Sequence, residues 1–199
     1  MRKVKNFKIP IYYYDIERKS KKEGIDAIEL FGGKENYEKN FKEYVSNFVS
    51  YLSPSAVYDT IEMIEMEKLF GKDIISSLDT KGCNIYSFVI ITMGSDIEQK
   101  MALLEDFELA VSKIIMDVYS NTAVKSVCEM VAEESKKENF EVSDPVYLYV
   151  DGKKLVEFPL KELSERLLSN KISVFFENDS FKPLYTRFFY LKWVTKKKK

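Results

Sequence analysis

The sequence predicts an α+β fold with a largely antiparallel, mixed sheet flanked by helices. Three observations support this prediction. Long stretches carry apolar residues at helical spacing, one short run is apolar on both faces as a buried strand is, and hairpin-like segments fill the last third. These elements do not follow the regular alternation of strand and helix that a parallel sheet needs.

Length and composition define the class of protein. The chain has 199 residues, which predicts a single domain over 1–199 with residues 1–33 as an N-terminal extension or edge. A hydrophobic content of 45% excludes a disordered chain. The net charge of -1 argues against nucleic acid as the main partner, because phosphate binding needs a basic excess. The basic residues 196–199 are expected to form a solubilising tail.

Some chemistries are excluded by the residues that the chain lacks. It contains no histidine, which rules out a histidine triad, an imidazole general base and histidine-ligated zinc. Its two cysteines, Cys83 and Cys128, cannot build a cysteine-rich metal site or a disulfide framework, and we expect both to be reduced and buried. No apolar run is long enough to span a bilayer and no secretion signal is visible. These features predict a cytoplasmic protein with no membrane partner.

The first third of the chain predicts an edge strand followed by a helix. Residues 9–16 are expected to form the edge strand, and tyrosines 12–14 either line it or stack on a ligand. The spacing of apolar residues over 37–52 is helical, and this helix should stop before Pro54, which disfavours a helical residue in front of it. Residues 57–64 alternate as a strand does, with helix as the rival interpretation.

The middle of the chain contains its clearest strand and its longest helix. A short helix at 74–78 precedes a strand at 85–93, which is apolar on both faces and therefore predicted to be central in the sheet. Ser95 with Glu98 three residues later resembles a capping box that opens the next helix. Residues 105–138 form a long helix whose apolar residues cover more than one stripe, so it is buried on more than one side or kinked.

The last third is predicted to contain a hairpin, a short helix and two further strands. Residues 146–150 and 155–158 form a hairpin around Asp151-Gly152, a type I′ turn signal. A short amphipathic helix is then expected at 159–168, followed by strands at 172–176 and 188–194.

Few residues suggest chemistry by themselves. There is no glycine-rich phosphate loop, no nucleophile elbow and no metal-ligand spacing, so no catalytic or metal-binding residue is assigned. Thr92–Ser95 either presents backbone N–H groups to an anion or is an ordinary strand-to-helix connection. Asp117 lies in an apolar helical face, where a carboxylate needs a partner such as a backbone N–H or an arginine. Asn121 and Thr122 follow, and can bond to the backbone and bend the helix.

The order of several short segments resembles a known family. Leu78–Cys83 followed by Ile91–Gly94 resembles the L-x-x-x-G-C…T-x-G signature of the activation (reactivation) domain of cobalamin-dependent methionine synthase. Ile115–Ser120 lies where that family has L-D-A-x-G-S. Phe158–Leu160 is similar to its W-P-L, and Pro183 to the proline of its P-x-K-S. No single motif is specific, so the resemblance depends on their order and spacing.

The match covers roughly residues 54–190 and implies a C-shaped α+β domain that docks on a corrinoid protein. In that family the domain binds S-adenosylmethionine and places its methyl group over the cobalt of cobalamin held by the partner. One-electron reduction by a flavodoxin-like donor and methylation then restore methylcobalamin from inactive cob(II)alamin. The resemblance therefore implies a component of methyltransferase reactivation that works in trans in methionine biosynthesis, rather than an independent enzyme.

The resemblance also suggests cofactor-binding residues. The candidates for S-adenosylmethionine are Asp117, Asn121 and Tyr147, the last also explicable as a core or hairpin tyrosine. The family's R-x-x-x-G-Y motif is absent, since 141–147 has neither the arginine nor the Gly-Tyr pair. Arg187 is the nearest remaining arginine, but no motif match supports it. Two functions stay open: a stand-alone reactivation subunit, or a non-catalytic cap on a corrinoid protein that has lost S-adenosylmethionine binding.

Overall fold

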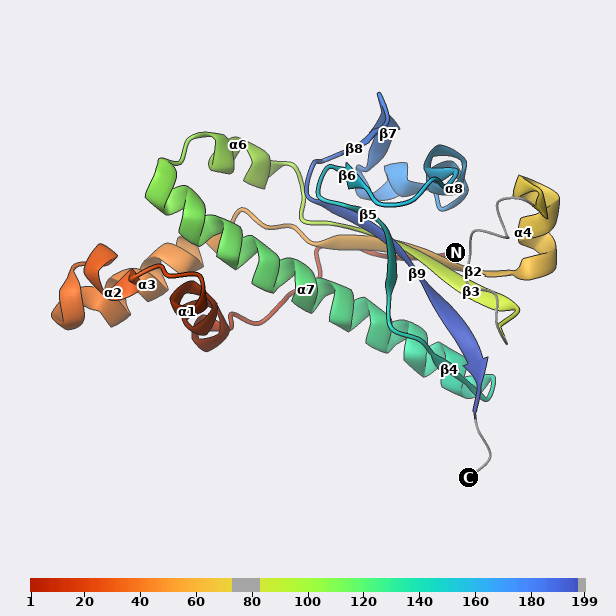
Figure 1. The fold of residues 1–199 in the computed structure, drawn as a ribbon, viewed down its shortest axis with the longest axis horizontal. Helices are drawn as coiled ribbons and strands as arrows, with labels where there is room; N and C mark the ends of the chain where they lie inside the picture. Colours follow the sequence, from red (N-terminus) through yellow and green to blue (C-terminus); the bar gives the residue numbers. More distant parts are fainter. Residues whose placement is uncertain (73–82, 197–199) are drawn as a thin grey trace.

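The computed structural model describes residues 1–72 and 83–196, and it confirms the α+β class (Figure 1). A seven-stranded sheet has the order β1-β2-β3-β9-β5-β6, with β4 also pairing with β9, and every one of these pairings is antiparallel. Its strands are β1 (Arg2–Val4), β2 (Ser55–Glu62), β3 (Ile85–Thr92), β4 (Phe140–Val142), β5 (Val146–Val150), β6 (Lys153–Lys154) and β9 (Thr186–Thr195). A separate hairpin is formed by β7 (Phe175–Glu177) and β8 (Ser180–Lys182).

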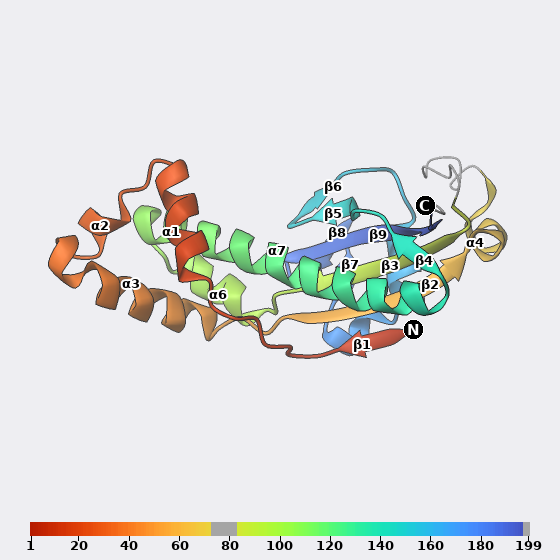
Figure 2. The same ribbon diagram turned by 90° about the horizontal axis from the view of Figure 1, so that it is seen from below.

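Helices cover both faces of the sheet. They are α1 (Tyr13–Lys22), α2 (Ala27–Leu30), α3 (Gly33–Val49), α4 (Met63–Phe70), α6 (Asp96–Ala102), α7 (Asp106–Lys137), α8 (Leu160–Arg166) and the 3-10 helix η1 (Ser169–Ile172). Figure 2 shows α7 running the length of the molecule, with α1, α2 and α3 gathered at the end away from the chain termini. The hairpin β7–β8 and α8 lie on the side of the sheet away from α7 (Figure 1).

Strand β3 is central and apolar on both faces, as the sequence predicts. It lies between β2 and β9, and its side chains alternate between two hydrophobic cores. Val89 and Ile91 belong to the core under α7, whereas Phe88 and Ile90 belong to the core that contains Leu163 of α8. The two cores explain why neither face of this strand carries charge.

Helix α7 is continuous from Asp106 to Lys137, and it is buried on more than one side. Three successive residues, Ile114, Ile115 and Met116, are all buried, which a helix with a single apolar stripe cannot achieve. One side of α7 packs on the sheet, and α1 and α3 pack against other parts of its surface. The N-terminal extension is therefore part of the same packed domain.

The prediction of an edge strand at 9–16 is wrong. The strand that pairs with β2 is Arg2–Val4, and α1 begins at Tyr13, so Tyr13 and Tyr14 are helical. The physical reason is burial at helical spacing. Ile16 and Ser20 are four residues apart, so a helix places them on one face, and both are fully buried against the rest of the domain. Residues between β1 and α1 form an extended segment without strand partners among the described residues.

The structure resolves the ambiguous segment 57–64 and confirms the predicted turn at Asp151-Gly152. Residues 57–64 are strand up to Glu62 and helix from Met63, so each interpretation holds for part of the segment. The turn at Asp151-Gly152 is confirmed, with φ of 46° and 92°, the positive values that a type I′ turn requires. The returning strand is only Lys153–Lys154, because the chain then leaves the sheet for α8.

The capping box at Ser95 and Glu98 is wrong, although the helix does begin there. The Ser95 side chain makes no capping bond, and the Glu98 carboxylate instead accepts the backbone N–H of Leu184. The strand expected at 172–176 is shifted, because Ile172 ends η1 and β7 begins at Phe175. The short helix expected at 74–78 and most of the basic tail lie outside the described residues.

Candidate functional site

Arg187 is a buried charge in the middle of the molecule. It lies on β9, opposite Ile91 of β3 and Val150 of β5, and only 7% of its surface is exposed. A guanidinium cannot lose its proton in a protein, so burial requires acceptors on all sides. The structure supplies these acceptors from α7 and from the β5–β6 turn.

Helix α7 brings two of the predicted site residues to this arginine. Asp117 and Asn121 are four residues apart and therefore share one face of the helix, and Asn121 Nδ2 donates to Asp117 Oδ2 at 3.0 Å. Arg187 Nη1 donates to Asn121 Oδ1 at 2.7 Å, and Nη2 reaches Asp117 Oδ1 at 3.4 Å. The expected pairing of Asp117 with an arginine is thus confirmed.

The turn between β5 and β6 supplies the third acceptor. Asp151 Oδ2 accepts from Arg187 Nε at 3.3 Å and from Nη2 at 3.2 Å. Burial raises the pKa of the Asp151 carboxyl, and the positive charge of Arg187 opposes that rise. The other oxygen, Oδ1, is buried without a hydrogen-bond partner among the described residues. Asp151 therefore keeps one free acceptor beside the arginine.

Tyr147 lies on the same side of the sheet as this cluster. It is half-buried on β5, where its ring packs on Phe189 with 5.5 Å between centroids. Burial raises the pKa of its hydroxyl, and the nearby charge of Arg187 acts in the opposite direction. All three predicted cofactor residues, Asp117, Asn121 and Tyr147, therefore meet around Arg187.

A groove opens from Asp117 and Asn121 toward the N-terminal extension. It has a volume of about 790 Å³ and runs between α1 and α7. Lys19 of α1 donates to Asp117 Oδ2, so the carboxylate bridges a lysine and the buried arginine. The groove has charges of both signs, with Arg18 and Lys22 among its basic groups and Glu23 among its acidic ones. Such a lining suits a ligand that is itself a zwitterion.

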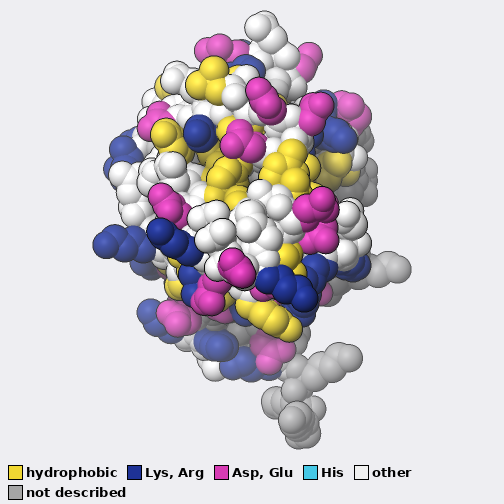
Figure 3. Space-filling view, turned by 90° about the vertical axis from the view of Figure 1, so that its left-hand side faces the viewer, with side chains coloured by type: hydrophobic (Ala, Val, Ile, Leu, Met, Phe, Trp, Pro, Cys, Tyr) yellow, Lys and Arg dark blue, Asp and Glu magenta, His cyan; other side chains and the backbone are white. Residues whose placement is uncertain are grey.

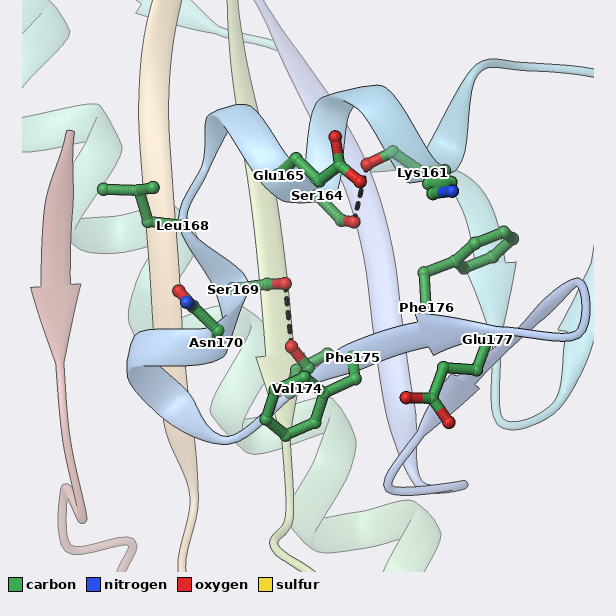
Figure 4. A pocket seen from close by; sticks show the side chains of 10 residues that line it. All are labelled: Lys161, Ser164, Glu165, Leu168, Ser169, Asn170, Val174, Phe175, Phe176 and Glu177. Atoms are coloured by element: carbon green, nitrogen blue, oxygen red, sulfur yellow. Dashed lines mark hydrogen bonds between the residues drawn. The ribbon is translucent and has the colours of Figure 1, made fainter.

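A second hollow lies between α8, η1 and β7 (Figure 4). Its volume is about 340 Å³, but its hydroxyls already bond to backbone oxygens: Ser164 Oγ donates to Lys161 O at 2.7 Å, and Ser169 Oγ donates to Val174 O at 2.8 Å. Both bonds are visible as dashed lines in Figure 4. The two serine hydroxyls have no proton left to donate to a ligand, which makes the hollow a weaker candidate.

The strand-to-helix connection at Thr92–Ser95 is explained by packing. The Gly94 N–H donates to Thr92 Oγ1 at 3.2 Å. Gly94 has φ of 91°, and a side chain at this position would collide with Ser53 Oγ. The glycine is therefore required by the turn and by its neighbour, and its N–H is not free for an anion.

Cys83 is buried and Cys128 half-buried, both as free thiols, and burial raises the pKa of Cys128 to about 11. Within residues 1–72 and 83–196, no group of acidic or cysteine side chains is arranged to hold a metal ion. None of the helices in that part of the chain has the length and apolar character needed to cross a membrane.

The end of the molecule formed by α2, α3 and α6 has a mixed surface. Figure 3 shows acidic and basic side chains side by side on this face, with hydrophobic groups between them. The hydrophobic groups of these elements include Leu30 at the end of α2, 42% exposed, and Leu103 after α6, 80% exposed. This face shows no continuous basic surface of the kind that nucleic-acid binding needs.

No protein-family model matches the chain, and no curated protein matches it in sequence. The resemblance to the activation domain of methionine synthase thus depends on the residues quoted above. One segment that contributes to it, Leu78–Gly82, lies outside the described residues.

Three members of the cluster were not assigned to the site from the sequence, although Arg187 was named as the nearest arginine without a motif match. Arg187 was visible as an arginine directly before the apolar run that begins at Phe188, a position that is costly to a charge unless partners are present. Asp151 was interpreted only as a turn residue. Lys19 gave no signal, because its contact with Asp117 spans 98 residues of sequence.

Proposed function

We propose that this protein is a stand-alone reactivation subunit of a cobalamin-dependent methionine synthase, with S-adenosylmethionine as methyl donor. The observation that carries the proposal is the meeting of Asp117, Asn121 and Tyr147 around the buried Arg187. Asp117 comes from the α7 segment that resembles the family, and Asn121 directly follows that segment. Tyr147 comes from the hairpin that stands where the family motif is missing.

The charges of the groove support a zwitterionic ligand. S-adenosylmethionine carries an ammonium and a sulfonium cation together with one carboxylate. The Asp117 carboxylate can accept from an ammonium, and Arg18, Lys19 and Lys22 can pair with a carboxylate. These basic residues of α1 would take the part of the arginine that the family places in R-x-x-x-G-Y. A volume of about 790 Å³ is within the usual range of small-molecule sites.

The chain itself contributes position and charge. Arg187 and Lys19 pair with Asp117 and hold its carboxylate in place on α7, and neighbouring residues of β9 pack in the apolar core under that helix. The partner's cobalamin, when docked, supplies the electron-accepting and methyl-accepting centre. This division of labour would require no histidine or other general base of this chain.

The test uses a methionine synthase that lacks its own activation domain and carries cob(II)alamin. This protein, S-adenosylmethionine and a one-electron donor are added, and the visible spectrum is followed. We expect conversion to methylcobalamin that depends on this chain, and a loss of at least about tenfold in S-adenosylmethionine affinity for Asp117→Asn. Glu38→Gln, which neutralises an exposed carboxylate on α3, is the matched control. Absence of both conversion and binding to the synthase would refute the proposal.

One observation favours a second candidate, a cap that binds the corrinoid protein without S-adenosylmethionine. Arg187 already donates to Asp117, Asn121 and Asp151, and Lys19 already bonds to Asp117, so the charged groups of the cluster are paired within the protein, and Asp151 Oδ1 stays without a hydrogen bond among the described residues. Binding to the synthase without conversion, and without calorimetric binding of S-adenosylmethionine, would support the cap.

A further inference from the structure

A polar hollow lies at the end of the sheet where β2 begins and β3 ends. Its volume is about 230 Å³. Ser55 of β2 and Thr92 of β3 are register partners that line the hollow, and they are only 6% and 1% exposed. The start of the chain reaches the hollow with Lys5, and the turn after η1, a helix that packs on β2, reaches it with Ser173. Apart from Lys5, none of the described residues that line the hollow is charged.

The buried hydroxyls of the hollow fix the backbone around it. Ser55 Oγ accepts the Asn6 N–H at 3.1 Å. Thr92 Oγ1 accepts the Gly94 N–H at 3.2 Å. A Cβ added to Gly94 would collide with the Ser53 hydroxyl, so the glycine leaves room for that hydroxyl at the wall. These two N–H groups are therefore occupied, and a ligand must be bound by the donors that remain.

Three donors of the lining remain free. Among the described residues, the Lys5 ammonium and the hydroxyls of Ser53 and Ser173 have no hydrogen-bond or ion-pair partner. The Ser95 hydroxyl is not free, because it donates to Asp96 Oδ1 at 3.3 Å. A cation and hydroxyls without acceptors are groups that can donate to an oxyanion.

The surroundings of the hollow also favour an anion. Lysines lie in or next to three segments of its lining, namely Lys5, Lys171 and Lys182, and none of them forms an ion pair among the described residues. The two carboxylates at the start of α6, Asp96 and Glu98, already accept hydrogen bonds from the protein. The local balance of unpaired charge is therefore positive.

We propose that this hollow binds a phosphate group, either as inorganic phosphate or as a small phosphate monoester, with Lys5, Ser53 and Ser173 donating to its oxygens. Hydrogen bonds from a lysine to an anion are charge-assisted and therefore strong. The donors come from three separate segments of the chain, which suits the four oxygens of a phosphate better than the two of a carboxylate. A volume of about 230 Å³ is below the usual range of drug-sized ligands, so it suits a phosphate with a few carbon atoms rather than a nucleotide. The hollow shares no lining residue with the groove between α1 and α7, so this proposal is independent of the proposed function.

The experiment titrates the full chain with inorganic phosphate, glycerol 3-phosphate and glycerol, with sodium chloride keeping the ionic strength constant. Binding is followed by amide NMR shifts and by calorimetry. We expect both phosphates, but not glycerol, to shift the amides of Lys5, Asn6, Ser53 and Ser173 in a saturable way. Tighter binding of glycerol 3-phosphate would assign the hollow to a monoester, and equal affinities would assign it to inorganic phosphate.

Three variants at exposed positions test the assigned donors. Lys5→Gln should weaken the binding of both phosphates about tenfold, since a charge-assisted hydrogen bond is lost. Ser173→Ala should weaken it about three- to fivefold, since one hydroxyl donor is lost. Lys34→Gln is the matched control, because it removes the same charge from an exposed lysine at the start of α3 that has no ion pair among the described residues. It should change neither affinity.

Three outcomes would overturn the proposal. The first is that neither phosphate shifts these amides beyond the effect of sodium chloride. The second is that glycerol binds as tightly as glycerol 3-phosphate, which would indicate a site for hydroxyl groups rather than for an anion. The third is that Lys5→Gln and Lys34→Gln weaken binding equally, because phosphate would then respond only to the overall charge of the protein.

Discussion

Arg187 Nη1 donates to Asn121 Oδ1 at 2.7 Å, and so joins β9 to α7 across 66 residues of sequence. The same guanidinium is bonded to Asp117 on α7 and to Asp151 in the β5–β6 turn. One buried cation therefore holds three separate elements in register. Its removal should affect the whole domain, because Asp151 then loses its cation and Asp117 keeps only Lys19.

Arg187→Leu should lower the free energy of unfolding by about 2 kcal/mol, because the half-buried Asp151 loses its cation and Asp117 keeps only Lys19. The measurement is urea denaturation, where a lower midpoint with an unchanged slope indicates lost stability. Arg18→Leu is the control: Arg18 is paired with Asp15 on an exposed helix face, with 70% of its side chain accessible. That substitution should cost less than about 0.5 kcal/mol. Equal losses of unfolding free energy in Arg187→Leu and Arg18→Leu would contradict the conclusion that the buried ion pairs of Arg187 stabilise the domain.

Tyr58 should make the protein less stable at alkaline pH. Burial, followed by the hydrogen bond to Glu134 at 2.8 Å, raises the pKa of Tyr58 from 10.0 to about 12. A raised pKa in the folded state means that the folded protein keeps a proton that the unfolded chain releases. The stabilisation that comes from this retained proton is fully present below pH 10 and is lost as the pH rises from about 10 to 12.

Tyr58→Phe should therefore show a shallower fall in urea midpoint between pH 9 and 11 than the wild type. Tyr14→Phe, which changes a ring that is 73% exposed, is the matched control and should keep the wild-type profile. Absorbance at 295 nm follows ionisation of the phenols in the same samples. Identical pH profiles for Tyr58→Phe and the wild type would show that Tyr58 is not a source of the alkaline loss.

Gly94→Ala should destabilise the domain for two reasons. A side chain at φ of 91° is strained, and its Cβ collides with Ser53 Oγ. Gly24→Ala separates the two effects, because Gly24 also has positive φ, 78°, with no heavy atom within 4 Å of the added Cβ. We expect the free energy of unfolding, measured by urea denaturation, to fall by about 1 kcal/mol in Gly24→Ala and by at least about 2 kcal/mol in Gly94→Ala. Similar losses would mean that the contact with Ser53 relaxes freely.

Ser87→Ala should leave the indole of Trp193 without a hydrogen-bond acceptor. Trp193 Nε1 donates to Ser87 Oγ at 2.9 Å, and Ser87 is fully buried on β3. The expected loss is about 1–3 kcal/mol, with a shift in the emission of the only tryptophan. Thr60→Val removes the other hydroxyl bonded to Ser87 but lies at an exposed position, so it should cost less and leave the emission unchanged. Equal losses of stability in Ser87→Ala and Thr60→Val would contradict the conclusion that the buried bond to Trp193 contributes more than the exposed bond to Thr60.

Much of the fold could be predicted from local patterns. The double apolar face of β3, the stop before Pro54, the long helix α7 and the Asp151-Gly152 turn follow from spacing and from backbone chemistry within a few residues. The prediction failed where contacts with residues far away in the sequence determine the local structure. Residues 9–16 alternate as a strand does, but β1 already pairs with β2, and the buried face of Ile16 and Ser20 favours a helix.

The sequence by itself determined the α+β class, the central strand and the need of Asp117 for a partner, because each depends on hydrophobic period or on the cost of a lone buried charge. Only the tertiary structure decided which partners meet. Arg187, Asp151 and Lys19 reach Asp117 over separations of 70, 34 and 98 residues, the second through Arg187. Such contacts are set by strand order and helix packing, and these depend on the whole chain rather than on any short segment.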